Sequence, residues 1–226
     1  MSRCVGSEIQ YVMSSIAIID YEMGNLHSIA KAVEHVAGDA RVRITSVPEE
    51  ILSADRVIFP GVGGIGHCME ALVRRGLDEV IREVAVNKPL LGICLGMQAL
   101  LGHSEENGGV DCLGLFDGEV RRFSETLNDK GVRLKVPHMG WNRVHQQPHA
   151  LWQDIDQDSR FYFVHSYYAA PADSGECAGV ADYGGAFCCT LARGNLFAVQ
   201  FHPEKSQQAG LTLLRNFTRW DGQDSV

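Results

Sequence analysis

The first hundred residues alternate between short apolar runs and segments with helical spacing. The runs at 15–20, 56–64 and 89–94 have the length and composition of buried strands. After the first run, apolar residues recur every three or four positions, at Leu26, Ile29, Ala30, Val33, Val36 and Ala37. Strands that alternate with helices in this way predict a parallel sheet, wound right-handedly, with helices on its faces.

The pattern changes near residue 110. Before it, the spacing predicts a helix over 69–84 that turns at Gly76, and another over 97–106. After it, short β-rich runs predict antiparallel or mixed sheet, and a closing helix follows over 207–220. We expect one α/β domain over 15–222, with a central, mostly parallel sheet flanked by helices and an additional antiparallel or mixed sheet in the C-terminal half. Residues 1–14 form a predicted flexible extension, in which Met13 is a second candidate start.

Composition disfavours several classes of function. The net charge of −8 and the sequence pI of about 5.5 disfavour nucleic-acid binding. No apolar run approaches the roughly 18 to 20 residues that span a bilayer, and residues 1–14 lack the apolar core of a secretory signal. Seven cysteines without CxxC spacing indicate neither a disulfide framework nor a zinc site. We expect a cytoplasmic protein with no metal, no nucleic-acid partner and no membrane contact.

The sequence GICLG, residues 92–96, places Cys94 between a predicted strand and a predicted helix. Ligands gather at the carboxyl ends of strands in such sheets, and the N–H groups of a helix start favour a thiolate. Gly92 and Gly96 resemble the glycines of a nucleophile elbow, with sulfur in place of the serine hydroxyl. The alternative is a structural thiol buried at a tight turn.

A thiolate nucleophile needs a base and a group that orients the base. His202 ends the apolar strand LFAVQF, Pro203 stops that strand, and Glu204 is placed to orient the imidazole. We interpret six other histidines as ordinary surface or partly buried residues: His27, His35, His67, His103, His145 and His149. The short sequence HPE is weak by itself and gains meaning only together with the cysteine turn.

A glycine-rich turn, FPGVGG over 59–64, follows another predicted strand. Its backbone N–H groups are placed to face a developing oxyanion. The alternatives are a phosphate-binding loop and a plain turn. Because the turn lacks the Lys-Ser/Thr ending of a P-loop and does not complete a GxGxxG pattern, we discount nucleotide binding.

Together, PGVGG, GICLGMQ and QFHPEKS resemble the class I glutamine amidotransferases, over residues 15–220. The stretches IIDYEMGNLHSIAKA, VPHMGWN and YFVHSYY are more specific, because they resemble the glutaminase subunit of imidazole glycerol phosphate synthase. The resemblance implies the class I amidotransferase fold, no cofactor, and hydrolysis of L-glutamine to glutamate and ammonia in histidine biosynthesis. It implies a triad of Cys94 as nucleophile, His202 as general base and acid, and Glu204 as orienter.

Further site residues come from the resemblance alone. It implies that the backbone N–H groups of Val62 and Leu95 meet the oxyanion. The implied glutamine-binding residues are Gly61, Gly63, Gln98, His165, Ser166 and Tyr167.

The resemblance also implies a partner, a (β/α)8 cyclase subunit that forms a heterodimer with the glutaminase, receives its ammonia and makes imidazole glycerol phosphate and AICAR. The residues implied at the partner interface or the ammonia gate are Met139, Trp141, Asn142, Tyr162 and Lys205. From composition alone, Trp141 fits better as a buried residue at a β-turn, and Lys205 as a solvated lysine.

Three alternatives stay open at this point. The same triad would serve a stand-alone hydrolase of γ-glutamyl compounds or other amides, or another class I amidotransferase subunit. A redox or chaperone protein with an exposed elbow cysteine is the non-catalytic alternative, but it has no use for His202 and Glu204. The run Gly64-Ile65-Gly66 departs from the family pattern in its glycine content, which leaves the rigidity of the oxyanion turn open.

Overall fold

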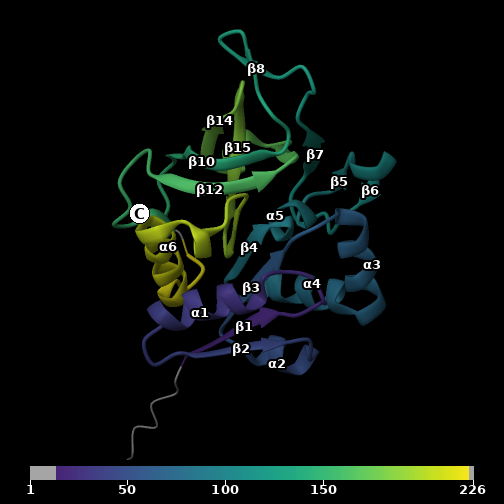
Figure 1. Ribbon diagram of the computed structural model, residues 1–226. Coiled ribbons are helices and arrows are strands. Elements are labelled where there is room, and N and C mark those ends of the chain that lie inside the picture. The colour runs from purple at the N-terminus through teal and green to yellow at the C-terminus, as the bar shows by residue number, and fades with distance from the viewer. Residues whose placement is uncertain (1–13, 224–226) are drawn as a thin grey trace, which may run out of the picture.

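Five parallel strands form one half of a large sheet (Figure 1). The computed structural model describes residues 14–223, so the predicted extension lies almost entirely outside the described residues. The parallel strands are β1 (Ser15–Ile19), β2 (Arg41–Thr45), β3 (Arg56–Gly61), β4 (Leu90–Cys94) and β16 (Leu196–Val199). Their order is β2-β1-β3-β4-β16, and every neighbouring pair is parallel. The predicted parallel sheet is confirmed.

The inner strands β1, β3, β4 and β16 are almost entirely apolar because both faces of the sheet are covered, whereas the edge strand β2 carries Arg41 and Arg43. Alternate residues of β1 enter different cores, so that Ile16 and Ile18 pack on one face while Ala17 and Ile19 pack on the other.

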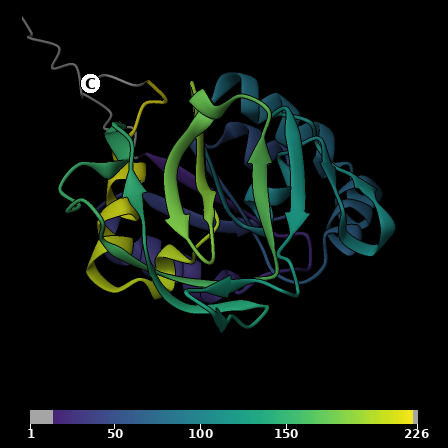
Figure 2. The same cartoon turned by 90° about the horizontal axis from the view of Figure 1, so that it is seen from above.

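Helices cover both faces. They are α1 (Leu26–Val36), α2 (Pro48–Ser53), α3 (Ile65–Arg75), α4 (Leu77–Asn87), α5 (Leu95–Ala99) and α6 (Gln207–Arg219). Buried residues of α1 and α6 share one core, and those of α2, α3 and α4 share the other. Figure 2 shows the yellow α6 and the blue-to-teal α3 and α4 on opposite sides of the molecule. Within residues 14–223, no helix is long and apolar enough to cross a membrane.

One predicted helix boundary is confirmed and another is wrong. The turn at Gly76 is confirmed, because this residue has φ +66° and separates α3 from α4. The helix predicted over 97–106 is wrong beyond Ala99. The returning segment 113–116 donates its N–H groups to the carbonyls of Ala99, Leu100 and Leu101, which ends the helix there.

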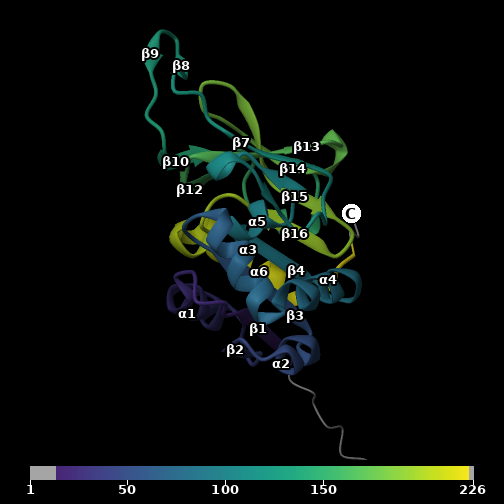
Figure 3. The ribbon, with the colours of Figure 1, turned by 90° about the vertical axis from the view of Figure 1, so that its right-hand side faces the viewer.

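The antiparallel strands continue the same sheet, because β15 (Ala186–Arg193) pairs antiparallel with β16. The other strands of this half are β5 (His103–Ser104), β6 (Val110–Asp111), β7 (Gly118–Arg122), β11 (His145–Gln146), β13 (Tyr167–Pro171) and β14 (Cys177–Asp182). The additional sheet expected from the sequence is the separate pair β10 (His138–Arg143) and β12 (Arg160–His165). A small hairpin of β8 (Asn128–Asp129) and β9 (Val132–Arg133) lies at the end of the molecule opposite α2 (Figure 3).

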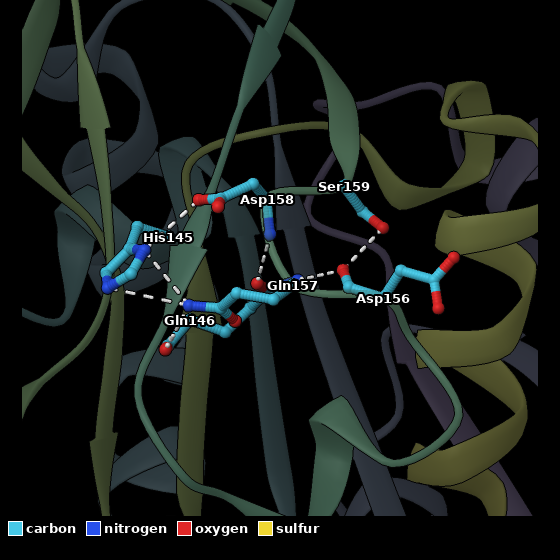
Figure 4. Close-up of polar contacts among 6 residues, drawn as sticks. All are labelled: His145, Gln146, Asp156, Gln157, Asp158 and Ser159. Carbon is cyan, nitrogen blue, oxygen red and sulfur yellow. Dashed lines mark hydrogen bonds and ion pairs between the residues drawn. The ribbon is translucent and has the colours of Figure 1, made fainter.

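The connection from β11 to β12 is fastened by its own polar side chains (Figure 4). Gln146 donates to the Asp156 carbonyl at 3.0 Å and accepts from the Asp158 N–H at 2.9 Å. His145 lies 3.1 Å from the Asp158 carboxylate. The network closes the turn before β12, and β12 leads into the pocket described below.

Candidate active site

Cys94 is the last residue of β4 and the N-cap of α5. Its backbone has φ 55° and ψ −107°, a strained conformation for a residue with a side chain. The side chain of a nucleophile elbow is held at a strand-to-helix turn in this way. The elbow predicted from GICLG is therefore present in the backbone.

The two flanking glycines are required by close packing. A Cβ atom on Gly96 would lie 2.0 Å from the carbonyl oxygen of Phe59 on the neighbouring strand. A Cβ atom on Gly92 would lie 3.0 Å from the Cβ of Ala198 on the other neighbouring strand. The turn can therefore approach both neighbours of β4 only if residues 92 and 96 have no side chain.

His202 reaches Cys94 because β16 is the direct neighbour of β4. Val199 lies opposite Ile93 in this parallel pair, so Gln200 follows opposite Cys94 and His202 comes two residues later. The His202 N–H donates to the Tyr162 carbonyl at 2.9 Å, and its carbonyl accepts from the Ser206 hydroxyl at 2.6 Å. The backbone that carries the imidazole is held from both sides.

Glu204 orients the imidazole. Its Oε1 lies 2.9 Å from Nδ1 of His202, and the two side chains are 0 % and 3 % exposed. Nε2 of His202 completes no hydrogen bond in the structure, which leaves it available on the side away from Glu204. Burial opposes a charge on this ring, but its interactions with Cys94 and Glu204 outweigh burial and raise the pKa of His202 to about 10. The imidazole is thus suited to hold the thiol proton.

Most of the predicted site residues line one cavity of about 330 Å³. They are Val62, Gly63, Cys94, Leu95, Gln98, His165, Ser166, Tyr167 and His202. Gly61 lies opposite Cys94 in the β3–β4 pair but not on the cavity wall, and Glu204 lies behind His202. In the described part of the chain, no group of three or more His, Cys, Asp or Glu residues is arranged to hold a metal ion.

Gln98 and Gln200 connect two walls of this cavity. Nε2 of Gln98 donates to the Tyr167 carbonyl at 3.0 Å and to Oε1 of Gln200 at 2.9 Å. Nε2 of Gln200 in turn donates to the sulfur of Cys94 at 3.8 Å. Gln200 was not predicted as a site residue. An amide between the apolar residues Val199 and Phe201 is nevertheless a signal in the sequence, because a buried amide needs hydrogen-bond partners, and Gln200 is fully buried in the structure.

Glu106 is a second residue that the sequence did not single out. It lines the cavity, and its Oε2 accepts a 3.0 Å hydrogen bond from the N–H of Ile65 at the start of α3. Its other oxygen would lie 3.1 Å from a Cβ on Gly64. Glu106 thereby holds the segment after the glycine-rich turn, and Ile65 is fully buried. The cavity is completed by Pro137 and Val164, which were also missed.

The glycine-rich turn is supported from below by Tyr21. A Cβ on Gly61 would lie 2.3 Å from the Tyr21 hydroxyl, so only glycine fits there. Gly63 has φ +98°, which also favours glycine. Val62, between them, is partly exposed and lines the cavity.

The residues expected at a partner interface lie outside the cavity, on β10, β12 and the turn that follows β16. The side chains of Met139 and Trp141 are exposed, at 63 % and 42 %. The Trp141 ring lies 6.1 Å from that of Tyr162, and Nζ of Lys205 lies 6.0 Å from the same Tyr162 ring. Asn142 is half-buried on the same strand as Trp141.

The family model for class-I glutamine amidotransferases matches residues 17–220. The chain belongs to this family. The amidotransferase is also 60 % identical, over 212 residues, to the imidazole glycerol phosphate synthase subunit HisH of Methylococcus capsulatus, covering 92 % of this chain and 98 % of that protein. It is 57 % identical to subunit HisH of Pseudomonas putida, over 93 % of this chain and 100 % of that one. These identities confirm the resemblance stated above, and with it the expected glutaminase function in histidine biosynthesis.

Solved structures agree on the fold of this amidotransferase. PurLQS from Thermotoga maritima has a TM-score of 0.69 at 14 % identity, over 92 % of this chain and 98 % of that one. A glutamine amidotransferase from the same organism has a TM-score of 0.56 at 16 % identity, over 84 % and 76 % of the two chains. The predicted class I amidotransferase fold is confirmed.

Proposed function

We propose that Cys94, His202 and Glu204 are the catalytic triad with which this amidotransferase hydrolyses L-glutamine. The observation that carries the proposal is the buried His202–Glu204 pair, 2.9 Å apart, beside a cysteine on a strained elbow at the same cavity. The sulfur attacks the carboxamide carbon of glutamine, and the C–N bond then breaks while the imidazolium of His202 gives its proton to the leaving ammonia. Water, deprotonated by His202, hydrolyses the γ-glutamyl thioester to glutamate and restores the thiol.

The cavity walls provide complementary groups for the rest of the substrate. We propose that the backbone N–H groups of Val62 and Leu95 stabilise the oxyanion, as the turn and the helix start both border the sulfur. Both N–H groups of Gln98 are already used, so its Oε1 is the atom that remains to accept a hydrogen bond from glutamine. The carboxylate of Glu106 supplies a negative charge for the α-ammonium group.

We propose further substrate contacts from the other predicted residues. Gly63 leaves room for the ligand at the cavity wall, whereas Gly61 contributes by letting the turn pack against Tyr21 behind that wall. His165, Ser166 and Tyr167 form another part of the wall. The amidotransferase domain extends over residues 15–222 in this proposal, slightly beyond the family match.

The ammonia released from glutamine needs an acceptor. The relatives named above are subunits of imidazole glycerol phosphate synthase, which implies a partner subunit. We propose that this partner is a (β/α)8 cyclase, bound as a heterodimer over Met139, Trp141, Asn142, Tyr162 and Lys205. The free thiols of the described cysteines fit a cytoplasmic location for the complex.

The deciding experiment measures glutamate release by the full chain alone, with the cyclase subunit, and with the cyclase and its nucleotide substrate. We expect weak turnover alone, strong turnover in the full mixture, and none for Cys94→Ser in any of them. Rapid turnover by the isolated chain would instead favour a stand-alone hydrolase. A diazo-ketone analogue of glutamine, followed by mass spectrometry, should label Cys94, and an adduct on Cys188 alone would refute the triad.

A further inference from the structure

A line of hydrogen bonds begins at the half-buried Asn142 on β10, whose Nδ2 also donates to the Asp182 carbonyl at 2.7 Å, and enters the glutamine pocket. Nδ2 of Asn142 lies 3.4 Å from Nε2 of His138, whose Nδ1 lies 3.0 Å from Nε2 of His165. Nδ1 of His165 lies 2.7 Å from the carbonyl oxygen of Tyr167. Both imidazoles are at least 95 % buried, at 3 % and 5 % exposure. None of the mechanism above uses His138.

The same Tyr167 carbonyl accepts a second hydrogen bond, from Gln98. Gln98 also donates to Gln200, which donates to the sulfur of Cys94. Every link from Asn142 to the nucleophile is therefore a hydrogen bond or a shared acceptor.

The donor and the acceptor are fixed in each hydrogen bond between Asn142 and the Tyr167 carbonyl. Burial lowers the pKa of His138 to about 4 and that of His165 to about 3, so both rings are neutral near pH 7. A carbonyl oxygen only accepts, which places the proton of His165 on Nδ1 and leaves its Nε2 to accept from His138. His138 therefore carries its proton on Nδ1 and accepts from Asn142 on Nε2.

Packing holds His138 in this orientation. Its ring is stacked between those of Tyr183 and Phe163, with centroids 4.0 Å and 4.9 Å away. It lies directly opposite His165 in the β10–β12 pair. The ring therefore has little freedom to break one hydrogen bond in favour of another.

We propose that His138 is a positioning residue for glutamine hydrolysis, which acts through His165, the Tyr167 carbonyl, Gln98 and Gln200 to hold the sulfur of Cys94. The proposal rests on the proposed function. It also connects the thiol to β10, the strand whose opposite face exposes Met139 and Trp141.

The test compares His138→Phe with His138→Asn in the full chain. Phenylalanine keeps the stacked ring but loses both hydrogen bonds, whereas the asparagine amide places a donor near the position of Nδ1. We expect the rate of Cys94 alkylation by iodoacetamide at pH 7, located by mass spectrometry, and the kcat for glutamine each to fall about tenfold in His138→Phe. KM should change less than kcat, and His138→Asn should recover most of both rates.

His145→Phe is the matched control, because His145 is an exposed histidine on β11, outside this line of hydrogen bonds. Equal alkylation and kcat in His138→Phe and wild type would overturn the proposal, as would an equal loss in His138→Asn. If His138→Phe does not fold, ¹⁵N chemical shifts of the wild-type imidazoles decide: a proton on Nε2 of either ring contradicts the assigned line. The alkylation measurement needs no substrate, so it tests this proposal even if wild type proves not to hydrolyse glutamine.

Discussion

The hydroxyl of Tyr21 donates a 2.8 Å hydrogen bond to the carbonyl oxygen of Pro60, directly beneath the glycine-rich turn. Tyr21 is fully buried, and burial raises its pKa well above the usual value, so the hydroxyl stays protonated as a donor. The turn that carries Val62 and Gly63 is therefore anchored to the end of β1 through a residue that never touches the substrate cavity.

Tyr21→Phe should lower the free energy of unfolding by about 1 to 2 kcal/mol, because it leaves the buried Pro60 carbonyl without its donor. The kcat for glutamine should fall as well, since the oxyanion donors lose their support. Denaturant unfolding and a glutamate-release assay measure the two effects. The control is Tyr183→Phe, which removes a hydroxyl bonded to the Lys135 carbonyl at the surface. Equal losses in both variants would contradict a special role for Tyr21.

Cys94→Gly should be more stable than Cys94→Ala by about 1 kcal/mol, although neither hydrolyses glutamine. The reason is the backbone at residue 94, whose φ of 55° is costly for alanine and not for glycine. Thermal or denaturant unfolding of the two variants gives the difference directly. The opposite order would show that the elbow is not strained.

Glu204→Gln should reduce kcat by roughly 10- to 100-fold, and His202→Ala by more, because losing the orienter costs less than losing the base. Removing the carboxylate should also lower the pKa of His202 from about 10, which an NMR titration of the ring follows. The pKa of His202 in the folded chain exceeds the usual 6.5. The stability contributed by its positive charge is therefore fully present below pH 6.5 and is lost as pH rises through about 10. Wild type and Glu204→Gln should therefore differ in stability near pH 7 and converge above pH 10. An unchanged His202 titration would contradict this assignment.

Gly96→Ala should prevent formation of the elbow, because its Cβ would meet the Phe59 carbonyl oxygen at 2.0 Å. We expect a loss of several kcal/mol, about 3 or more, and no activity. Gly66→Ala is the matched control, because Gly66 lies within helix α3 and a Cβ there would meet only Val110, at 3.8 Å. It should raise stability by about 0.5 to 1 kcal/mol. A stable, active Gly96→Ala enzyme would refute the close approach of these strands.

The free energy of unfolding should fall as pH drops from 6.5 toward 4. His138 and His165 have folded pKa values of about 4 and 3, below the usual 6.5, so the unfolded chain binds more protons in this range. Each ring contributes a slope of at most about 1.4 kcal/mol per pH unit. Asparagine does not titrate, so His138→Asn does not lose the stability that His138 loses in wild type as pH falls. The difference in free energy of unfolding between wild type and this variant should therefore shrink toward pH 4. A deficit that is constant with pH would show that His138 is not held neutral by the fold.

Local sequence patterns predicted much of the fold. The apolar runs that predicted β1, β3 and β4 place side chains in the cores on both faces of the sheet. Gly76 separates two helices, at the position where a turn was predicted. Two elements in the first half, β2 and α2, were missed. The strand β2 is an edge strand with mostly half-buried residues, which weakens its apolar signal. Pro48 followed by Glu49 and Glu50 is nevertheless a recognisable helix start.

The site was predictable where short motifs carry the chemistry and not where the tertiary fold brings distant segments together. Cys94 and His202 stand out in their own turns. Glu106 lies in an irregular segment, and Gln200 and His138 act through hydrogen bonds to residues far away in the sequence. No local periodicity indicates that β16 lies beside β4, or that segment 113–116 ends helix α5.

The pairing of β4 with β16 has a consequence for how this chain can diverge. The sulfur and the imidazole are held in register by two neighbouring strands, whatever the length of polypeptide that loops out between them. Insertions or deletions in the antiparallel half can reshape the outer surface for a new protein neighbour without moving the reacting atoms relative to each other. The loops between the strands can therefore change in length while the sulfur and the imidazole keep their separation, provided that the residues lining the cavity are kept.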